Sequence, residues 1–183
     1  MKLKEVILSN QMKKGYGKLL KWLDSPFRRK FNDPVKLVSK AQIMKGQIVL
    51  EIGCGSGFFT QEISKQVGSE GKVYATDIHP LAIEEMKKKI QQLGITNVVP
   101  QREDATNTSF ENETFDIIIL YGVVPAPVIP LTELSNEMNR ILKSGGVCAI
   151  WTAVPFWRPR KIMKYGRLIK LRRVRPVFRL QKQ

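Results

Sequence analysis

Short apolar segments alternate with segments of helical periodicity through the middle of this chain. Five apolar runs cover residues 47–52, 72–77, 97–101, 115–121 and 147–152. Helical patterns lie between some of them, at residues 58–67, 80–93 and 131–142. Alternation at this spacing indicates right-handed crossover connections between parallel strands. The sequence therefore predicts an α/β fold with one doubly wound, mostly parallel sheet and helices on both of its faces.

The chain has 183 residues, enough for one domain with a sizeable core. We expect residues 46–153 to form the Rossmann-like core. Residues 1–45 are expected to form a basic helical cover, and residues 154–183 to complete the sheet through a basic helix and hairpin. The three segments are thus predicted to build one domain around one sheet.

The two flanking segments carry more detailed predictions. In the N-terminal cover, we expect amphipathic helices at residues 16–24 and 35–43, joined by a basic turn at residues 26–30. In the C-terminal segment, we expect a short helix at residues 160–165 and then a reduced hairpin. The hairpin strands are predicted at residues 168–172 and 177–181.

The net charge of +15 is distributed unevenly along the chain. Residues 1–45 contain 12 Lys and Arg against 3 Asp and Glu, and residues 154–183 contain 11 against none. Residues 46–153 contain 8 against 13. Two basic ends around an acidic middle indicate a polyanionic neighbour, either nucleic acid or an anionic membrane surface. A solvated basic surface without a partner is the alternative.

Several classes of protein are disfavoured by what the chain contains. Cys54 and Cys148 form no CxxC pair and His79 is the single histidine, so no metal site is expected. The apolar stretch at residues 115–131 includes Asp116 and three prolines, which disfavours a membrane span. We expect a cytoplasmic protein, with peripheral attachment to a membrane as one option.

The stretch VLEIGCGSGFFT, at residues 49–60, places three glycines within five positions between an apolar run and a helical pattern. A glycine-rich turn at this place lets a ligand approach the main chain closely. A phosphate-binding P-loop would need a Gly-Lys-Ser/Thr that the chain lacks. A dinucleotide site would need a third glycine where Phe58 stands. The pattern that remains is G-x-G-x-G with Glu51 two residues upstream.

This pattern resembles the first motif of the class I S-adenosylmethionine-dependent methyltransferases. The resemblance implies that the glycine loop passes under the methionine and ribose portion of S-adenosyl-L-methionine, and that Glu51 orders water or the amino group. The product would be S-adenosyl-L-homocysteine. The cofactor-binding residues implied for this loop are Glu51, Gly53, Cys54, Gly55 and Gly57.

Further elements of the resemblance follow in order along the chain. Asp77 ends the second apolar run, where the family places a carboxylate on the ribose hydroxyls, and Ile78 follows it. Asp104 and Ala105 follow the third run, where the family reads the adenine edge. The sequence LKSGG at residues 142–146 is similar to the family's turn before its fifth strand, with Ser in place of Pro. The resemblance covers about residues 46–152.

The chemistry of methyl transfer explains why no catalytic constellation stands out. The reaction is an in-line displacement, so alignment of the reactants is the main task. A general base is needed only for an acceptor that starts protonated. Tyr121 and His79 are the candidates for such a role, and Tyr121 is also a candidate for binding the cofactor. A cap on the following helix is the alternative role for His79.

The chain is most similar to the small methyltransferases of ubiquinone and menaquinone biosynthesis. This similarity implies a small or lipophilic acceptor, quinone- or lipid-like. Apolar residues interleaved with Lys and Arg in both ends would dock the protein on an anionic membrane. The first alternative is an RNA or DNA methyltransferase that binds phosphates through the same ends. A non-catalytic cofactor-binding protein is the second. A second copy of the chain is a candidate partner, because the final hairpin is short.

Overall fold

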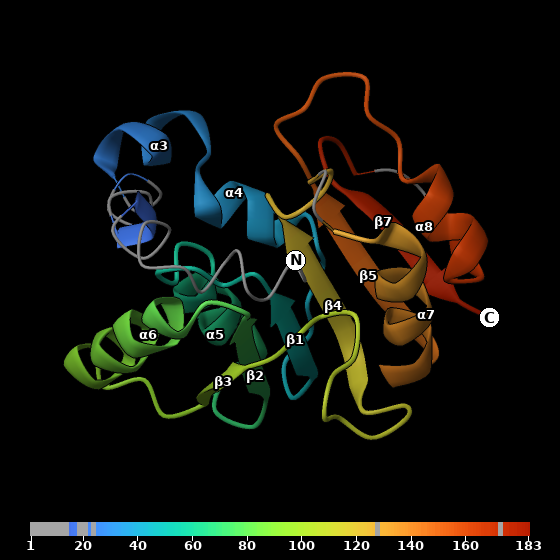
Figure 1. Cartoon of the computed structure of the whole chain (residues 1–183). Helices are drawn as coiled ribbons and strands as arrows, with labels where there is room; N and C mark the ends of the chain where they lie inside the picture. Colours follow the sequence, from blue (N-terminus) through green and yellow to red (C-terminus); the bar gives the residue numbers. More distant parts are fainter. Residues whose placement is uncertain (1–14, 18–21, 23–24, 127–128, 172–173) are drawn as a thin grey trace.

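A seven-stranded sheet crosses the computed structural model, which describes residues 15–17, 22, 25–126, 129–171 and 174–183 (Figure 1). The strands are β1 (Ile48–Ile52), β2 (Lys72–Asp77), β3 (Val98–Arg102), β4 (Phe115–Tyr121), β5 (Leu142–Trp151), β6 (Leu168–Lys170) and β7 (Phe178–Lys182). Their order is β3-β2-β1-β4-β5-β7-β6. The first five are parallel, and β7 pairs antiparallel with both β5 and β6. The predicted doubly wound α/β fold is confirmed.

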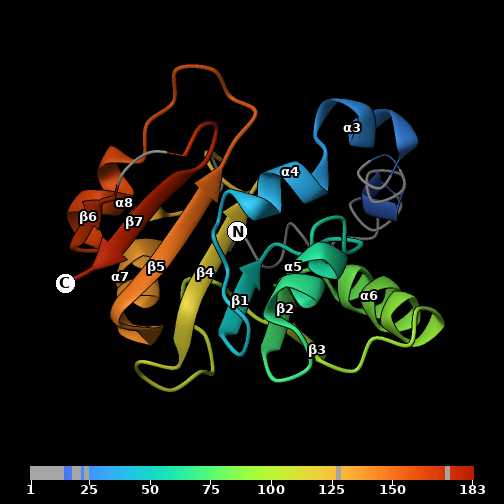
Figure 2. The same cartoon turned by 180° about the vertical axis from the view of Figure 1, so that it is seen from behind.

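Helices cover both faces of this sheet (Figures 1 and 2). The first face is covered by α4 (Pro34–Ser39), α5 (Thr60–Val67) and α6 (Pro80–Gln92). The second face is covered by α7 (Leu131–Ile141) and α8 (Arg160–Tyr165). A further helix, α3 (Pro26–Phe31), stands above the edge of the sheet where the parallel strands end.

The apolar run of β4 explains how one sheet serves two cores. Ile117 and Ile119 point into the core under α5, and Ile118 and Leu120 point into the core under α7. All four side chains are at most 2% exposed. Because successive residues of a strand point to opposite faces, a strand covered on both sides must be apolar throughout.

The strand order reverses direction at the carboxyl ends of β1 and β4, the place where open α/β sheets have their ligand crevice. From β1 the chain moves outward to β2 and β3, and it then returns to place β4 on the other side of β1. The loops after β1 and β4 therefore leave in opposite directions. In open α/β sheets, ligands bind at such a reversal point.

The N-terminal cover differs from the prediction in its helices. Residues 26–30, expected as a turn, lie in α3, where Ser25 caps the helix by accepting a hydrogen bond from the Arg28 amide at 3.3 Å. Ser25 followed by Pro26 is a helix-start signal that the basic composition obscured. The helix expected at residues 35–43 ends at Ser39, and Gln42 has a φ of 58° that a helix does not allow.

Part of the predicted helix at residues 16–24 lies outside the described residues. Residues 15–17 and 22 are helical. In the C-terminal segment, the predicted short helix and hairpin are present as α8, β6 and β7. Arg172, expected at the end of the first hairpin strand, is also outside the described residues.

The turn predicted at residues 144–146 is an irregularity within β5. Phe115 pairs with Leu142 and Ile117 with Val147, so β5 advances five residues while β4 advances two. Gly145 has a φ of 75°, which allows the extra residues to loop outward. The strand therefore begins earlier than the apolar pattern alone indicates.

Candidate functional site

Glu51 lies one residue before the end of β1, and its side chain is 2% exposed. Its carboxylate accepts a hydrogen bond from the hydroxyl of Thr60, the first residue of α5. Burial raises the pKa of Glu51 to about 8, because the charged form is poorly solvated there. A cation bound at this place would favour the ionised carboxylate.

The glycine loop after β1 is held close to its neighbours. A Cβ atom on Gly53, which has a φ of 73°, would lie 2.6 Å from the side chain of Val123 in the loop after β4. A Cβ on Gly57, with a φ of 81°, would lie 3.0 Å from Met86. The amides of Gly53 and Cys54 both donate to the Thr76 carbonyl, at 2.8 and 2.9 Å. The loop is therefore tied to β2 and packs so closely on Val123 and Met86 that side chains at positions 53 and 57 would clash with them.

Asp77 ends β2 beside this loop. Its carboxylate accepts hydrogen bonds from the amides of Gly55 at 3.1 Å and His79 at 2.9 Å. The hydroxyl of Tyr16 lies 3.3 Å from each of its oxygens. Burial raises the pKa of Asp77, and the two amide hydrogen bonds oppose that rise. The carboxylate is thus built into the end of the sheet, with its position set by backbone groups.

Together these groups define the chemistry that the crevice can accommodate. Glu51 and Asp77 come from adjacent parallel strands and face one glycine loop. Buried carboxylates favour a ligand that brings positive charge and hydroxyl donors. S-adenosylmethionine carries a sulfonium, an amino group and two ribose hydroxyls. The two carboxylates therefore suit the cofactor that the sequence resemblance implies.

The predicted adenine-side residues lie at the same edge. The Glu103 amide donates to the Asp77 carbonyl at 3.2 Å, which places the loop after β3 beside β2. Asp104 accepts hydrogen bonds from the amide and hydroxyl of Thr106 through one carboxylate oxygen. Ala105 packs against the core under α7, and Ile78 is half-buried next to Asp77.

Tyr121 contacts the helical cover. Its hydroxyl donates to the Leu37 carbonyl of α4 at 3.0 Å, and its ring lies edge-on to Phe59. Burial raises the pKa of Tyr121, which disfavours the phenolate. The geometry gives Tyr121 a role in anchoring α4, and it does not favour the catalytic role predicted from its place at the strand end.

His79 caps the next helix. Its Nδ1 accepts a hydrogen bond from the Leu81 amide at 3.2 Å at the start of α6. The ring is 1% exposed and stacks on Tyr16, with 3.8 Å between centroids and 13° between planes. This position agrees with the capping alternative raised from the sequence, and the acid–base role again finds no support.

The thiol of Cys54 acts as a small packing group within the glycine loop. It is 4% exposed, its Sγ lies 3.8 Å from the Gly55 carbonyl, and burial raises its pKa well above the usual value. Among the described residues, no group of three or more His, Cys, Asp or Glu could hold a metal ion. None of the described helices is long and apolar enough to cross a membrane.

Two residues of the cover reach the crevice without having been predicted. Tyr16 reaches Asp77, as described above. Arg28 of α3 places its guanidinium carbon 4.1 Å from the centroid of the Phe58 ring, directly after the glycine loop. The sequence around these two residues does not indicate their positions, because each contacts a partner more than 25 positions away in the chain.

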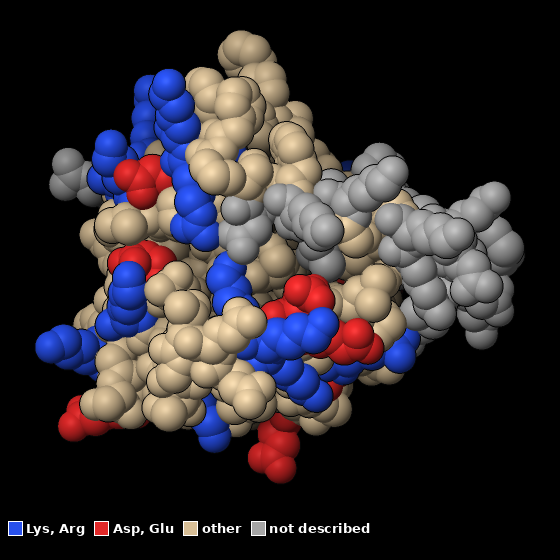
Figure 3. Space-filling model, turned by 90° about the vertical axis from the view of Figure 1, so that its left-hand side faces the viewer, with Lys and Arg blue, Asp and Glu red and all other residues tan. Residues whose placement is uncertain are grey.

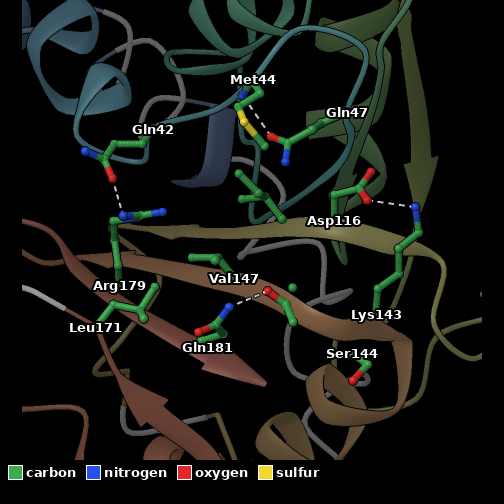
Figure 4. Close-up of a pocket in the computed structure, with 13 residues that line it drawn as sticks. Gln42, Met44, Gln47, Asp116, Lys143, Ser144, Val147, Leu171, Arg179 and Gln181 are labelled. Carbon is green, nitrogen blue, oxygen red and sulfur yellow. Dashed lines mark hydrogen bonds and ion pairs between the residues drawn. The ribbon is translucent and has the colours of Figure 1, made fainter. Parts of the chain in front are cut away.

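A separate hollow of about 520 Å³ lies away from this site (Figure 4). It is lined from the amino ends of β4 and β5, from β7 and from the segment before β1. Its polar side chains pair with one another or with backbone: Asp116 with Lys143, Gln42 with Arg179, and Gln181 with the Gly145 carbonyl. Because ligands of parallel sheets bind at the carboxyl edge, we do not assign the reaction to this hollow.

Comparisons with known proteins identify the family. Residues 43–173 match the family described as "Methyltransferase domain". A solved structure of a SAM-dependent methyltransferase from Aquifex aeolicus superimposes with a TM-score of 0.75 and 25% identity, over 90% of this chain and 96% of that one. Geranyl diphosphate C-methyltransferase from Streptomyces coelicolor, crystallised with S-adenosyl-L-homocysteine, gives a TM-score of 0.67 at 15% identity, over 89% and 68%.

Curated relatives act on different acceptors. The catalytic subunit of a tRNA (adenine(58)-N(1))-methyltransferase from Yarrowia lipolytica is 31% identical over 63% of this chain. A demethylmenaquinone methyltransferase from Staphylococcus aureus is 35% identical over 57% of this chain. The chain spans only 30% of the length of the first relative and 42% of the second.

Proposed function

The chain belongs to the class I S-adenosylmethionine-dependent methyltransferases, and we propose that its acceptor is a small, lipophilic, quinone- or lipid-like molecule. The observation that carries the acceptor proposal is the set of exposed aromatic residues on α3 and in the loop after β5, Phe27, Phe31 and Phe156. The proposal extends to a basic surface that docks the enzyme on an anionic membrane.

The bound cofactor supplies an electrophilic methyl group on a sulfonium. The protein's own part is to bind and orient. Asp77, held by the Gly55 and His79 amides, is placed to accept hydrogen bonds from ribose hydroxyls. Glu51, whose pKa is raised by burial, supplies negative charge beside cationic groups once it ionises. The glycine loop allows close approach of the ligand, so the reacting groups can be aligned.

Exposed aromatic residues lie on α3 and in the loop that follows β5. Phe27 and Phe31 of α3 are each 67% exposed, with 4.9 Å between their ring centroids. Phe156, in the loop after β5, is 90% exposed. In Figures 1 and 2, α3 and this loop both rise above the carboxyl edge of the sheet. Exposed aromatic side chains around a site suit an acceptor delivered from an apolar phase.

A recess of about 400 Å³ adjoins the loop after β4. Its lining is mostly apolar: Pro125, Ala126, Ile129, Leu131, Thr132 and Lys161. A recess of this size and composition is suited to a small ring or a short chain segment. It supports an acceptor of modest size.

Basic residues accompany the aromatic ones on α3. Helix α3 carries Arg28, Arg29 and Lys30 in its last turn and no acidic residue in its first. Figure 3 views the side on which α3 and α6 lie; Lys and Arg form a column at its upper left, and lower down they are mixed with Asp and Glu. Each basic residue near an anionic bilayer contributes about 1 kcal/mol of attraction. Arg28 and Arg29 are half-buried against the Phe58 ring, so Lys30 and the two phenylalanines are the groups of α3 that such a surface would meet.

An RNA acceptor is the second candidate, favoured by the similarity to a tRNA methyltransferase subunit. The same basic helix could bind phosphates, and its aromatic residues could stack on bases. No separate recognition module is visible in the described residues, so we place this candidate second.

The test uses methyl-labelled S-adenosylmethionine with the purified protein and a fractionated lysate. We expect label in the organic phase after organic–aqueous partition, stable to nuclease. An Asp77→Asn variant serves as the control for background transfer. Label that remains aqueous and is released by nuclease would overturn the lipophilic acceptor in favour of nucleic acid.

A further inference from the structure

The hollow at the amino edge of the sheet has the size of a small-molecule site (Figure 4). Its volume of about 520 Å³ falls within the range of ligand cavities. Residues 144–146, which loop outward from β5, line it together with Arg179 and Gln181 of β7. Four apolar side chains also line it: Met44, Ile117, Val147 and Leu171. A ligand here would therefore meet both polar and apolar groups.

Most acceptor oxygens of the hollow are already used by the protein. Asp116 accepts a hydrogen bond from Lys143 at 2.7 Å and, through its other oxygen, one from the Ile48 amide at 2.8 Å. The side-chain oxygen of Gln47 accepts from the Met44 amide at 2.8 Å. The donor groups of a ligand would therefore find few unused partners.

The donors of the hollow are used less completely. Arg179 donates from Nη1 to the side-chain oxygen of Gln42, but its Nε is buried and donates to no group of the described residues. The side-chain nitrogens of Gln42 and Gln47 also donate to nothing in the part of the chain that the structure describes. Gln181 differs, since its nitrogen donates to the Gly145 carbonyl at 2.9 Å. This balance suits a ligand that supplies acceptor oxygens.

The charge of Arg179 points to the same kind of ligand. Among the described residues, the ion pair of this hollow joins Asp116 to Lys143, and none reaches Arg179. Burial lowers the pKa of Arg179, because its half-buried guanidinium is partly removed from water. A cation in such a place is stabilised by an anion.

We propose that the hollow is a second binding site, for a small organic anion that places a carboxylate or phosphate on Arg179 and an apolar portion against Val147 and Leu171. The planar fork of guanidinium donors matches either acidic group. The side-chain nitrogens of Gln42 and Gln47 add neutral donors. The site lies at the edge opposite the glycine loop, so the anion would bind together with the cofactor, and the inference does not rest on the identity of the acceptor.

The experiment follows the backbone amide signals of the full chain by NMR, with S-adenosyl-L-homocysteine present to occupy the reaction site. The anionic probes are benzoate and phenyl phosphate. Benzamide is the neutral counterpart of benzoate, and inorganic phosphate is an anion without an apolar portion. All titrations are made at equal ionic strength, set with sodium chloride.

The variants are Arg179→Gln and a matched control, Lys170→Gln. Lys170 lies in the neighbouring strand β6, is exposed, and does not line the hollow. Its substitution removes the same charge. Thermal unfolding verifies that each variant is folded, and Arg179→Gln should be at least as stable as the unmodified protein because it removes an incompletely paired cation.

We expect benzoate and phenyl phosphate to shift the signals of Gly145, Gly146 and Val147 saturably, with a Kd on the order of 1 mM. Benzamide should bind about tenfold more weakly than benzoate, since it lacks the charge. Inorganic phosphate should bind more weakly than phenyl phosphate. Arg179→Gln should weaken both organic anions about tenfold or more, and Lys170→Gln should stay within about twofold.

Four results would overturn the assignment. Benzamide could bind as well as benzoate, which would leave the charge without a role; this comparison needs no variant. Equal losses in the two variants would indicate general attraction to a basic surface. Inorganic phosphate as tight as phenyl phosphate would remove the apolar portion from the proposal. Signals at the hollow that do not shift, or shift without saturation, would show that no anion binds there.

Discussion

The hydroxyl of Tyr16 lies 3.3 Å from both carboxylate oxygens of Asp77, and its ring stacks on His79. The contact joins the N-terminal cover to the end of β2 across 61 positions of the chain. Burial and the charge of Asp77 raise the pKa of Tyr16, so the phenol stays protonated and donates. It donates to the carboxylate that the family resemblance assigns to the ribose hydroxyls.

Tyr16→Phe is expected to bind S-adenosylmethionine more tightly. The phenol and the ribose hydroxyls would use the same acceptor, so the ligand must replace the Tyr16 hydrogen bond. Removing a bond worth about 1 kcal/mol should raise the affinity about fivefold, measured by calorimetry. Tyr165→Phe, in α8, is the matched control and should change nothing. Weaker binding by Tyr16→Phe would mean that the phenol contacts the bound ligand.

Asp77→Asn is expected to lower cofactor affinity by about 30-fold or more. The Gly55 and His79 amides donate to different oxygens of Asp77, so the single oxygen of the amide side chain keeps only one of these hydrogen bonds. The substitution also removes the charge that strengthens hydrogen bonds from hydroxyls. Gly55→Arg should abolish binding by filling the loop. Calorimetry measures both, with circular dichroism as the test of folding. Unchanged affinity in both folded variants would remove Asp77 and the loop from the site.

Glu51 should make cofactor binding depend on pH. Its pKa of about 8 in the folded, ligand-free protein lies above the reference value of 4.5. A bound cation favours the carboxylate, so affinity should rise between pH 6 and about pH 8 with release of a proton. Glu51→Gln should bind more weakly at pH 8 and lose this part of the pH dependence. Calorimetry in buffers of different ionisation enthalpy counts the protons; equal proton release in both proteins would contradict the role of Glu51.

The same residue has a predictable effect on stability. Between pH 4.5 and about pH 8 the folded state holds a proton on Glu51 that the unfolded state has lost. The contribution of Glu51 to the free energy of unfolding is therefore fully present below pH 4.5 and falls as the pH rises toward 8. Urea unfolding of the ligand-free protein and of Glu51→Gln should differ in this slope. Parallel slopes would show that Glu51 titrates normally.

Asp116→Ala should destabilise the fold without changing cofactor affinity. The carboxylate pairs with Lys143 at 2.7 Å and accepts a hydrogen bond from the Ile48 amide at 2.8 Å, which supports the starts of β4 and β1. The loss of both should cost about 1–2 kcal/mol in urea unfolding. Lys143→Met removes only a partly exposed ion pair and should cost about 0.5 kcal/mol. Equal effects would mean that the Ile48 bond contributes nothing.

Local pattern was sufficient for the strands of the core and for the glycine loop. The bounds of β2 and β4 agree with the apolar runs, because a strand covered on both faces must be apolar and ends where charged or turn residues begin. Glu51 and Asp77 could be singled out because each stands at a strand end beside the loop. Those signals depend on residues that are close in sequence.

Only the tertiary structure decided which side chains of the cover reach the strand ends and which partner the hydroxyl of Tyr121 takes. Tyr16 and Arg28 were invisible because their partners, Asp77 and Phe58, lie 61 and 30 positions away. Tyr121 looked like a site residue, yet its hydroxyl bonds to the Leu37 carbonyl of α4. The sequence determined the sheet through the spacing of apolar residues, and the loop through the conformational freedom of its glycines. Both depend on residues that are close together in the chain. The packing of α3 and α4 over the edge depends on contacts between distant segments, and no local period encodes them.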